Sequence, residues 1–217
     1  MAEAARVTTA KEHRSRAFWL KHLHQWHWVS AAACLIGMIL FSITGFTLNH
    51  ASWVTAQPEV TSRTAALPDE LRQTLQSLAG EKDGEKGPLP SAAVEWLSAE
   101  LSITAADREA EWSSDEIYVS LPRPGGDAWA TIDLASGDVT HEVTDRGWIS
   151  YFNDLHKGRN TGPAWSLFID VFAFTTLMFA VTGLLLLKMH SNHRPATWPM
   201  VGLGLVLPLL IAILFIH

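Results

Sequence analysis

The chain has 217 residues, of which 48% are hydrophobic, and a formal net charge of −6. This length fits one soluble domain, or a few membrane helices with a small domain. Hydrophobic residues gather in three long stretches that hold almost no charge, while charged residues gather between the first two. That distribution excludes a disordered chain, a collagen-like fibre and a single water-soluble domain. The one cysteine, Cys34, excludes an intramolecular disulfide and any multi-cysteine zinc or iron–sulfur site within one chain.

The three apolar stretches predict three transmembrane helices. They cover residues 28–48, 165–187, with the single charge Asp170, and 198–216. The first, at about 1.5 Å per residue, is about 31 Å long, enough to cross the hydrocarbon core. We read it as a signal anchor, because it is too long for a cleavable signal peptide. The predicted segments are a cytoplasmic N-terminal segment (1–24), a first transmembrane helix (25–50), a periplasmic domain (51–163), a second transmembrane helix (164–188), a cytoplasmic loop (189–197) and a third transmembrane helix (198–217).

The distribution of charge predicts the orientation. Basic residues outside the central segment all lie before the first helix or between the second and third. They are Arg6, Lys11, Arg14, Arg16, Lys21, Lys188 and Arg194. By the positive-inside rule that side is cytoplasmic, so we expect a bacterial inner-membrane protein with a periplasmic C-terminus. Residues 51–160 hold 9 basic and 19 acidic residues, which argues against nucleic acid as a partner.

The central segment predicts a small α+β domain. Leucines at helical spacing favour helices over 68–79 and over 91–101, the second capped by Ser91. Residues 80–87 are charged and glycine-punctuated, which favours a loop. From Glu116 onward the hydrophobic period changes to two, which favours strands. The predicted strands are 117–121, 128–134 and 138–143.

Several short motifs resemble a known membrane family. The run Trp129 to Val139, which reads strand, aspartate, glycine turn and strand, resembles the closing hairpin of a PepSY domain. Leu23-His24-Gln25-Trp26 and Thr44-Gly45 resemble the first helix of PepSY-associated transmembrane proteins. Residues 154–158, with the sequence Asp-Leu-His-Lys-Gly, and Thr182-Gly183 complete the resemblance, which covers about residues 20–190. Some members are similar to haem-containing reductases of ferric siderophores, so the resemblance implies a haem protein. Larger relatives have more helices, so this chain is similar to a minimal version.

Histidines gather near the predicted helix ends. With the predicted topology they form a cytoplasmic and an outer layer. The cytoplasmic layer holds His22, His24, His27, His190 and His193, and the outer layer holds His50, His156 and His217. Two neutral imidazoles from facing helices can hold a b-type haem without any cysteine. The competing interpretation is that each half-polar ring merely settles at the membrane interface.

These residues lead to a first hypothesis of haem-dependent electron transfer. His24 or His27 would pair with His190 inside, and His50 with His156 outside, each pair holding haem b. Asp154, Lys157 and Arg159 would border the outer site and meet an anionic ferric chelate or siderophore. No nicotinamide or flavin motif is present in the sequence, so electrons must come from another protein, a quinol or a soluble donor.

Other interpretations stay open. His27 and His50 are 23 residues apart, about 35 Å along one helix, which argues against a simple two-haem wire in one monomer. A homodimer would place six helices around such sites. Alternatively, the helices only anchor a PepSY-like module that binds an envelope protein, or the chain is a small subunit of a larger membrane complex.

Overall fold

The chain divides into two compact units. The computed structural model describes the backbone of residues 2–53 and 57–216, and the side chains of residues 15–53, 57–192 and 194–216. One unit comprises Met1–Leu40 and Phe168–His217, and the other comprises Phe41–Leu167. Two helices contribute to both units: α1 (Ala2–Asn49) and α5 (Pro163–His190). We call the first the membrane unit and the second the sheet unit.

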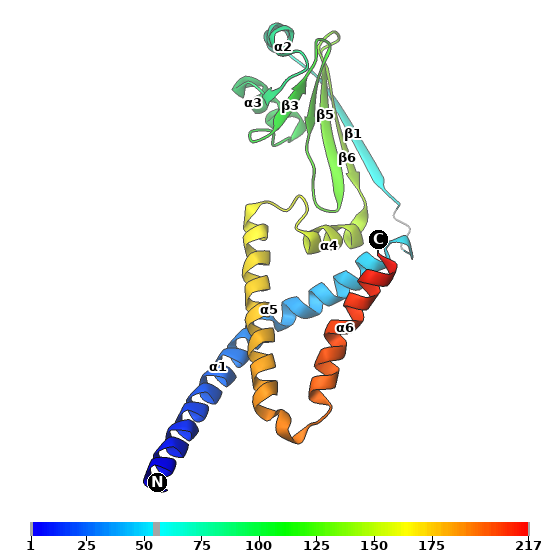
Figure 1. Cartoon of the computed structure of the whole chain (residues 1–217). Helices are drawn as coiled ribbons and strands as arrows, with labels where there is room; N and C mark the ends of the chain where they lie inside the picture. The colour runs from blue at the N-terminus through cyan, green and yellow to red at the C-terminus, as the bar shows by residue number, and fades with distance from the viewer. Residues whose placement is uncertain (1, 54–56, 217) are drawn as a thin grey trace. The chain divides into compact units, whose positions relative to one another are not determined.

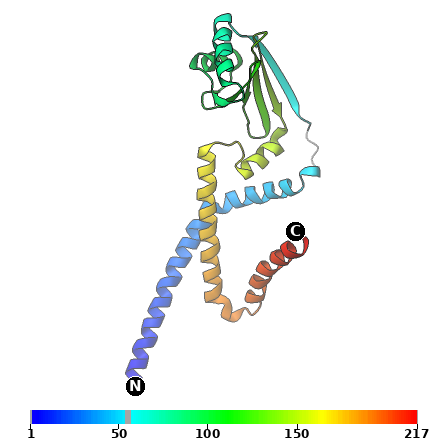
Figure 2. The ribbon, with the colours of Figure 1, turned by 45° about the horizontal axis from the view of Figure 1, so that its top comes forward.

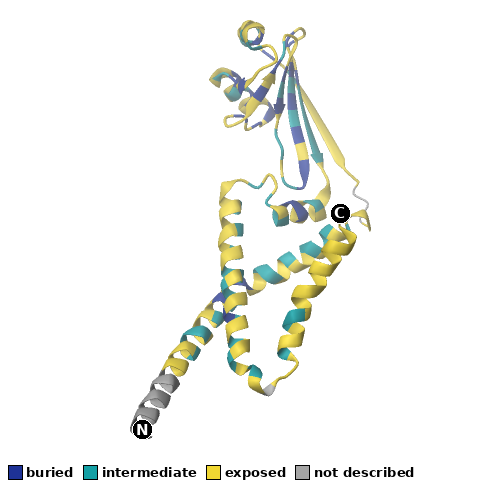
Figure 3. Ribbon diagram, viewed as in Figure 1, coloured by how far each residue is buried: buried dark blue, intermediate teal, exposed yellow. Residues whose placement is uncertain are grey.

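Three helices are long and apolar enough to cross a membrane. They are Ser15–Asn49 within α1, Pro163–His190 and α6 (Thr197–Phe215), with mean hydropathies of 2.1, 2.0 and 2.3. Side chains of α6 are exposed along almost its whole length (Figure 3). A helix satisfies its own backbone groups, so helices that are apolar on all faces suit hydrocarbon and not water. The three predicted membrane helices are confirmed. α1 continues as helix back to Ala2, well before residue 25.

Small residues let α1 and α5 approach closely in the membrane unit. A Cβ on Gly37 would overlap the ring of Phe172, and one on Gly183 would lie 3.2 Å from Cε1 of His27. Membrane helices associate through such close packing, because lipid tails remove the hydrophobic driving force between them. Glycines at these two positions therefore set the separation of α1 and α5.

The sheet unit is built on one antiparallel sheet of six strands. The strand order is β1-β6-β5-β4-β3-β2. Its elements in chain order are η1 (Ala51–Trp53), β1 (Glu59–Ala66), α2 (Asp69–Lys82), β2 (Lys86–Pro88), α3 (Ser91–Leu101), β3 (Glu109–Trp112), β4 (Glu116–Ser120), β5 (Gly126–Asp133), β6 (Asp138–Asp145) and α4 (Gly147–Lys157). α2 and α3 cover one face of the sheet in both views (Figures 1 and 2). Between helices and sheet lies an apolar core that includes Leu75, Leu97, Trp112 and Ile132.

The predicted elements of this unit are mostly confirmed. Helices 68–79 and 91–101 correspond to α2 and α3, and the three predicted strands correspond to β4, β5 and β6. Ser91 does not cap α3, because Pro90 holds the cap position and no side chain bonds there. The predicted loop 80–87 was wrong at both ends, since α2 runs to Lys82 and β2 begins at Lys86.

Besides β2 and the short η1, the sequence pattern did not predict β1, β3 and α4. β1 is exposed at nearly every residue, so it shows no alternation of apolar and polar side chains. It is an edge strand held by eight backbone-paired positions along β6. β3 has only four residues, too short for a period to stand out. α4 carries aromatic residues outward and polar residues inward, opposite to the pattern that marks a helix of a soluble domain.

The hairpin between β5 and β6 is shaped by Asp133. Its Oδ1 accepts hydrogen bonds from the backbone N–H groups of Ala135 and Ser136, both at 2.8 Å. Gly137 adopts φ +81° in the same turn, a conformation that glycine accepts without strain. The N–H groups around Ser136 favour the charged carboxylate and lower the pKa of Asp133 below its ordinary value. The strand–aspartate–glycine pattern therefore encodes the turn itself.

Replacing Asp133→Asn tests this turn. A lowered pKa in the folded state means that the carboxylate stabilises the fold above its unfolded pKa, about 3.9, and loses this effect as the pH falls. We expect the variant to melt below the wild type at neutral pH, and the two melting temperatures to converge in acid. Thermal unfolding of both proteins across this pH range measures the difference. A difference in melting temperature that is the same at every pH would show that the charge of Asp133 does not stabilise the turn.

α4 is attached to the turn between β4 and β5. The buried carboxylate of Asp154 accepts a hydrogen bond of 2.9 Å from the backbone N–H of Gly125. Gly125 has φ +75°, and a Cβ there would lie 2.8 Å from Cα of Tyr151. Glycine at 125 thus allows both the turn and the close approach of α4.

Replacing Gly125→Ala therefore destabilises the sheet unit. The left-handed backbone costs about 1–2 kcal/mol with any side chain, and the overlap with Tyr151 adds about 1–3 kcal/mol of overpacking. Gly84→Ala is the matched control, because Gly84 has φ +79° but nothing within 4 Å of its Cβ. We expect Gly125→Ala to lower the melting temperature clearly more than Gly84→Ala. Equal decreases in melting temperature would show that α4 does not pack closely against this turn.

Candidate functional site

The described histidines of the helix ends form two groups, each inside one unit. The α5-side group, in the membrane unit, consists of His24, His27 and His190. The α4-side group, in the sheet unit, consists of His50 and His156. His22 stands apart from both and packs on Phe18, with ring centres 4.3 Å apart. The side chain of His193 and all of His217 lie outside the described residues.

His24 and His190 come together from α1 and α5. Their ring centres are 5.9 Å apart, and the ring planes are nearly perpendicular at 84°. The predicted pairing of His24 with His190 is thus a real juxtaposition of side chains in the membrane unit. Each ring is oriented by its own helix: Nδ1 of His24 lies 2.8 Å from the carbonyl oxygen of Leu20, and Nδ1 of His190 lies 2.9 Å from that of Leu186.

His27 is held against α5 one turn further along α1. Its ring stacks on Phe179 with centres 4.6 Å apart. Its Nδ1 lies 3.1 Å from Oγ1 of Thr182 and 3.2 Å from the carbonyl oxygen of Phe179. The hydroxyl of the buried Thr182 donates to backbone oxygens of its own helix, at 2.7 Å to Met178, so its oxygen accepts from His27. Thr182 therefore binds this histidine, and Gly183 leaves room for its ring. We call such a threonine–glycine pair a histidine seat.

These contacts fix which ring nitrogen carries the proton. A carbonyl oxygen only accepts, so Nδ1 of His24 and His190 must be the protonated nitrogen in the neutral ring. The same holds for His27, which faces a carbonyl and a hydroxyl that already donates. Nε2 then keeps its lone pair, and it has no hydrogen bond to the described residues. A histidine oriented through Nδ1–H to a carbonyl is the usual arrangement of a metal ligand.

A groove of about 380 Å³ runs along this group. It is lined by His27, Gly183, Leu186, Leu187 and His190. Basic residues gather beyond it at the same end of the membrane unit: Arg16 donates to the carbonyl oxygen of Met189 at 3.3 Å, and Lys188 lines a neighbouring hollow with Arg16. Basic residues of α1 and α5 therefore lie close together at one end of the membrane unit.

In the α4-side group, His156 is the ordered member. Nδ1 of His156 lies 2.6 Å from Oγ1 of Thr44, whose hydroxyl donates to the carbonyl oxygen of Phe41. The His156 ring also packs on Phe41 at 4.8 Å, and Cε1 lies 3.6 Å from the position of a Cβ on Gly45. Thr44-Gly45 thus seats His156 as Thr182-Gly183 seats His27. Two of the motifs on which the family resemblance rests thus each contact a histidine.

The structure does not join His50 to His156. Nδ1 of His50 lies 2.9 Å from the carbonyl oxygen of Phe46, and its ring packs between Phe46 and Trp53, with ring centres within 4.3 Å. Neither a hydrogen bond nor a ring contact links the two histidines among the described residues. The predicted outer pair is therefore not assembled among the described residues: His50, one residue beyond α1, packs on Phe46 and Trp53, whereas His156 bonds to Thr44.

The chain was compared with known proteins. A family model described as PepSY_TM-like matches residues 18–217, nearly the whole chain. The chain belongs to the PepSY_TM-like family. The comparisons found no matching curated protein and no matching solved structure. The resemblance drawn from the sequence motifs is thus confirmed at the level of the family.

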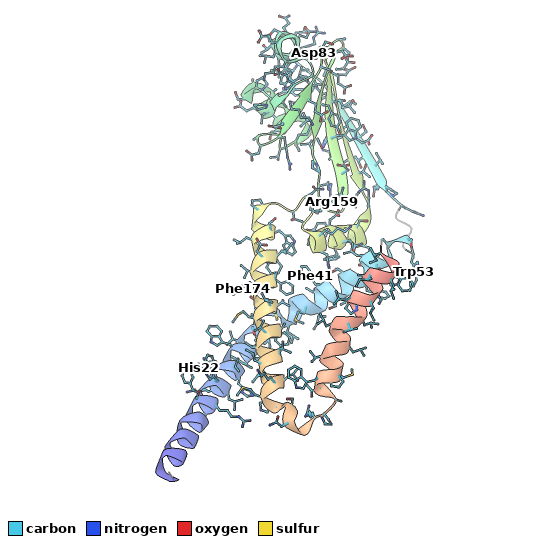
Figure 4. All side chains as sticks on the ribbon, in the orientation of Figure 1. His22, Phe41, Trp53, Asp83, Arg159 and Phe174 are labelled. Atoms are coloured by element: carbon cyan, nitrogen blue, oxygen red, sulfur yellow. The ribbon has the colours of Figure 1, made fainter. Side chains whose placement is uncertain are left out.

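The acidic and basic residues assigned to the outer site of this PepSY_TM-like protein behave differently. Asp154 is buried and bonded to Gly125, so its carboxylate holds the fold together and does not face a substrate. Lys157, the last residue of α4, and Arg159, just beyond it, are both exposed. Figure 4 shows Arg159. Asp170 is exposed on α5 and has no hydrogen bond to the described residues.

Metal sites that need three protein ligands have no candidate here. Among the described side chains, no group of three or more His, Cys, Asp and Glu residues could hold a metal ion. The arrangement offers pairs of imidazoles instead. A pair suits a metal whose other ligands come from a macrocycle, as in bis-histidine haem.

The hydrogen bonds predict the tautomer of three histidines. In alkaline buffer, solid-state nitrogen NMR of histidine-labelled protein should show Nδ1 protonated and Nε2 bare at His24, His27 and His190, whose Nδ1 atoms face carbonyl oxygens. His22, which has no Nδ1 hydrogen bond to the described residues, is the internal control and should show no such preference. Single His→Gln variants assign the signals. A proton on Nε2 at these three positions would contradict the arrangement.

Proposed function

We propose that this protein is a membrane haem b protein that transfers electrons, with His24 and His190 as the ligand pair. One observation supports this proposal. The imidazole rings of His24 and His190 come together from two membrane helices, and each has its Nε2 atom bare. With metal–imidazole bonds of about 2 Å, the 5.9 Å between ring centres is of the order that one metal ion between them requires.

The surroundings of the pair fit a flat apolar group. Leu186 and Leu187 supply an apolar wall beside Gly183, against which the His27 ring packs. His27 lies in the same groove and is the alternative ligand on α1. Leu20 and Leu186 each contribute a carbonyl that orients one ligand ring, which favours the tautomer that binds iron. Haem b, when bound, would supply a one-electron couple between ferric and ferrous iron.

The direction of transfer follows from the charges. The basic end of the membrane unit faces the cytoplasm of a bacterial cell, and the sheet unit, whose residues 51–160 carry an excess of acids, faces the periplasm. Electrons would then enter near His24 and His190 from a quinol or protein donor and leave outward. Lys157 and Arg159 supply positive charge on the outer side, where an anionic ferric chelate is the proposed acceptor.

A second haem would need a ligand that His50 does not supply in this arrangement. His156 is already oriented by Thr44, so one further imidazole would complete a site. We propose a homodimer or larger assembly as its source.

Spectroscopy of the purified protein tests the proposal. Protein expressed with ample haem should show the sharp reduced bands of bis-histidine haem b after dithionite. His24→Ala and His190→Ala should each remove most of the bound haem, whereas His22→Ala, the matched control near the same helix end, should leave it unchanged. His27→Ala separates the two candidate ligands on α1.

A colourless protein under these conditions would overturn the haem proposal. The anchored binding module would then be the better interpretation, and a tight periplasmic protein partner its signature. Haem that survives loss of both His24 and His190 would keep electron transfer but move the site elsewhere.

A further inference from the structure

Helix α4 presents its apolar side outward. Trp148, Ile149 and Phe152 lie on one side of this helix, with 76%, 43% and 49% of their surfaces exposed. The residues of α4 that are buried are polar: Asn153 and Asp154. A helix on the surface of a water-soluble domain has the opposite arrangement. The exposed aromatic rings also contact one another, Trp148 with Tyr151 at 5.9 Å and with Phe152 at 6.4 Å, so they form one continuous patch.

Polar contacts fix the helix in this inverted orientation. Asn153 accepts a hydrogen bond of 2.7 Å from the hydroxyl of Thr47 on α1, and Asp154 holds the N–H of Gly125 in the sheet. Rotating α4 to bury its aromatic residues would break both bonds and leave Asp154 without a partner. Losing hydrogen bonds to buried groups costs free energy, so these contacts hold the apolar face of α4 away from the sheet.

The position of α4 in the chain indicates what covers its apolar face. Thr44 and Thr47, which bind α4, belong to the span of α1 that can cross a membrane. Only residues 158–162 separate α4 from the second span, at most about 18 Å of extended chain. In addition, Nε1–H of Trp165, in the first turn of that span, donates to the carbonyl oxygen of Leu155 at 2.9 Å. α4 is therefore tied at two points to helices that enter the bilayer.

The charges around α4 fit a lipid surface. Arg146, Lys157 and Arg159 are exposed at its two ends beside one exposed acid, Asp145, while the acid within the helix, Asp154, is buried. Residues 145–159 thus hold three basic and two acidic residues, within a domain that carries a large excess of acids. Exposed basic residues beside an apolar face are typical of helices that lie in the headgroup layer of anionic membranes.

We infer that α4 is an interfacial membrane helix whose Trp148–Ile149–Phe152 face lies in the headgroup layer of the bilayer that α1 and α5 cross. Tryptophan and other aromatic rings favour this depth. The helix then fixes the height of the sheet above the lipid and holds His156, on its last turn, at the membrane surface. This inference does not depend on haem.

Spin labels on α4 test the inference directly. Ile149→Cys and Phe152→Cys are made in the full chain, labelled and placed in nanodiscs of phosphatidylethanolamine and phosphatidylglycerol. Collisions with oxygen, which concentrates in lipid, are compared with collisions with a water-soluble nickel chelate. Ala99→Cys, an exposed position on α3 in the same unit, is the matched control, and the unmodified chain gives the background from the buried Cys34.

The ratio of oxygen to nickel collisions should be several-fold higher at both α4 positions than at residue 99. A ratio equal to that at residue 99 would overturn the inference, because the face would then lie in water. Strong protection from both reagents would also overturn it, since a protein partner or a second copy would then cover the face. Two positions are used so that one misfolded variant, recognised by circular dichroism, does not decide the result.

Discussion

Hydrogen bonds between histidine rings and oxygen atoms of the helices are the constraint on which the membrane unit depends. His24 and His190 bond to the carbonyl one turn earlier in their own helix, and His27 bonds to α5. Each of these bonds uses Nδ1–H and leaves Nε2 with a lone pair. The hydrogen bonds that orient the rings therefore also leave each ring with the nitrogen that a metal would bind.

Each of the two threonine–glycine pairs, Thr182-Gly183 and Thr44-Gly45, both binds a histidine and leaves room for its ring. The hydroxyl of Thr182 donates to its own helix and accepts from His27 of another helix, and Oγ1 of Thr44 lies in hydrogen-bond contact with Nδ1 of His156. The following glycine leaves room for the imidazole, since a Cβ on Gly183 would lie 3.2 Å from the His27 ring. Either residue alone has an ordinary packing explanation in a membrane helix. Their combination explains why two dipeptides far apart in the sequence both sit against a histidine.

The sequence predicted most of the architecture because length, hydropathy and period are local properties. Three apolar stretches suffice for the spans, and leucine spacing suffices for α2 and α3. β1 could not be found this way, because an edge strand with exposed side chains depends on its partner β6 and not on its own pattern. The pairing of His24 with His190 could be predicted, because the charge pattern placed both at one membrane surface. The role of Asp154 could not be predicted, since nothing in the sequence indicates that the N–H of Gly125 would meet its carboxylate.

α4 shows why a pattern that breaks a rule is informative. Its aromatic stripe has helical spacing, and in a soluble domain it would face the core. Here the polar residues Asn153 and Asp154 occupy the inner side, where each has a partner that an apolar residue could not replace. Those bonds stabilise an orientation of α4 that exposes an apolar face. In water, this exposure would be unfavourable. In a chain whose neighbouring helices enter a bilayer, the same face adds to the stability of the folded protein. The lipid is thus part of the solvent in which this domain folds. We therefore interpret the sheet unit as a membrane-surface domain and not as a soluble domain that the helices merely anchor.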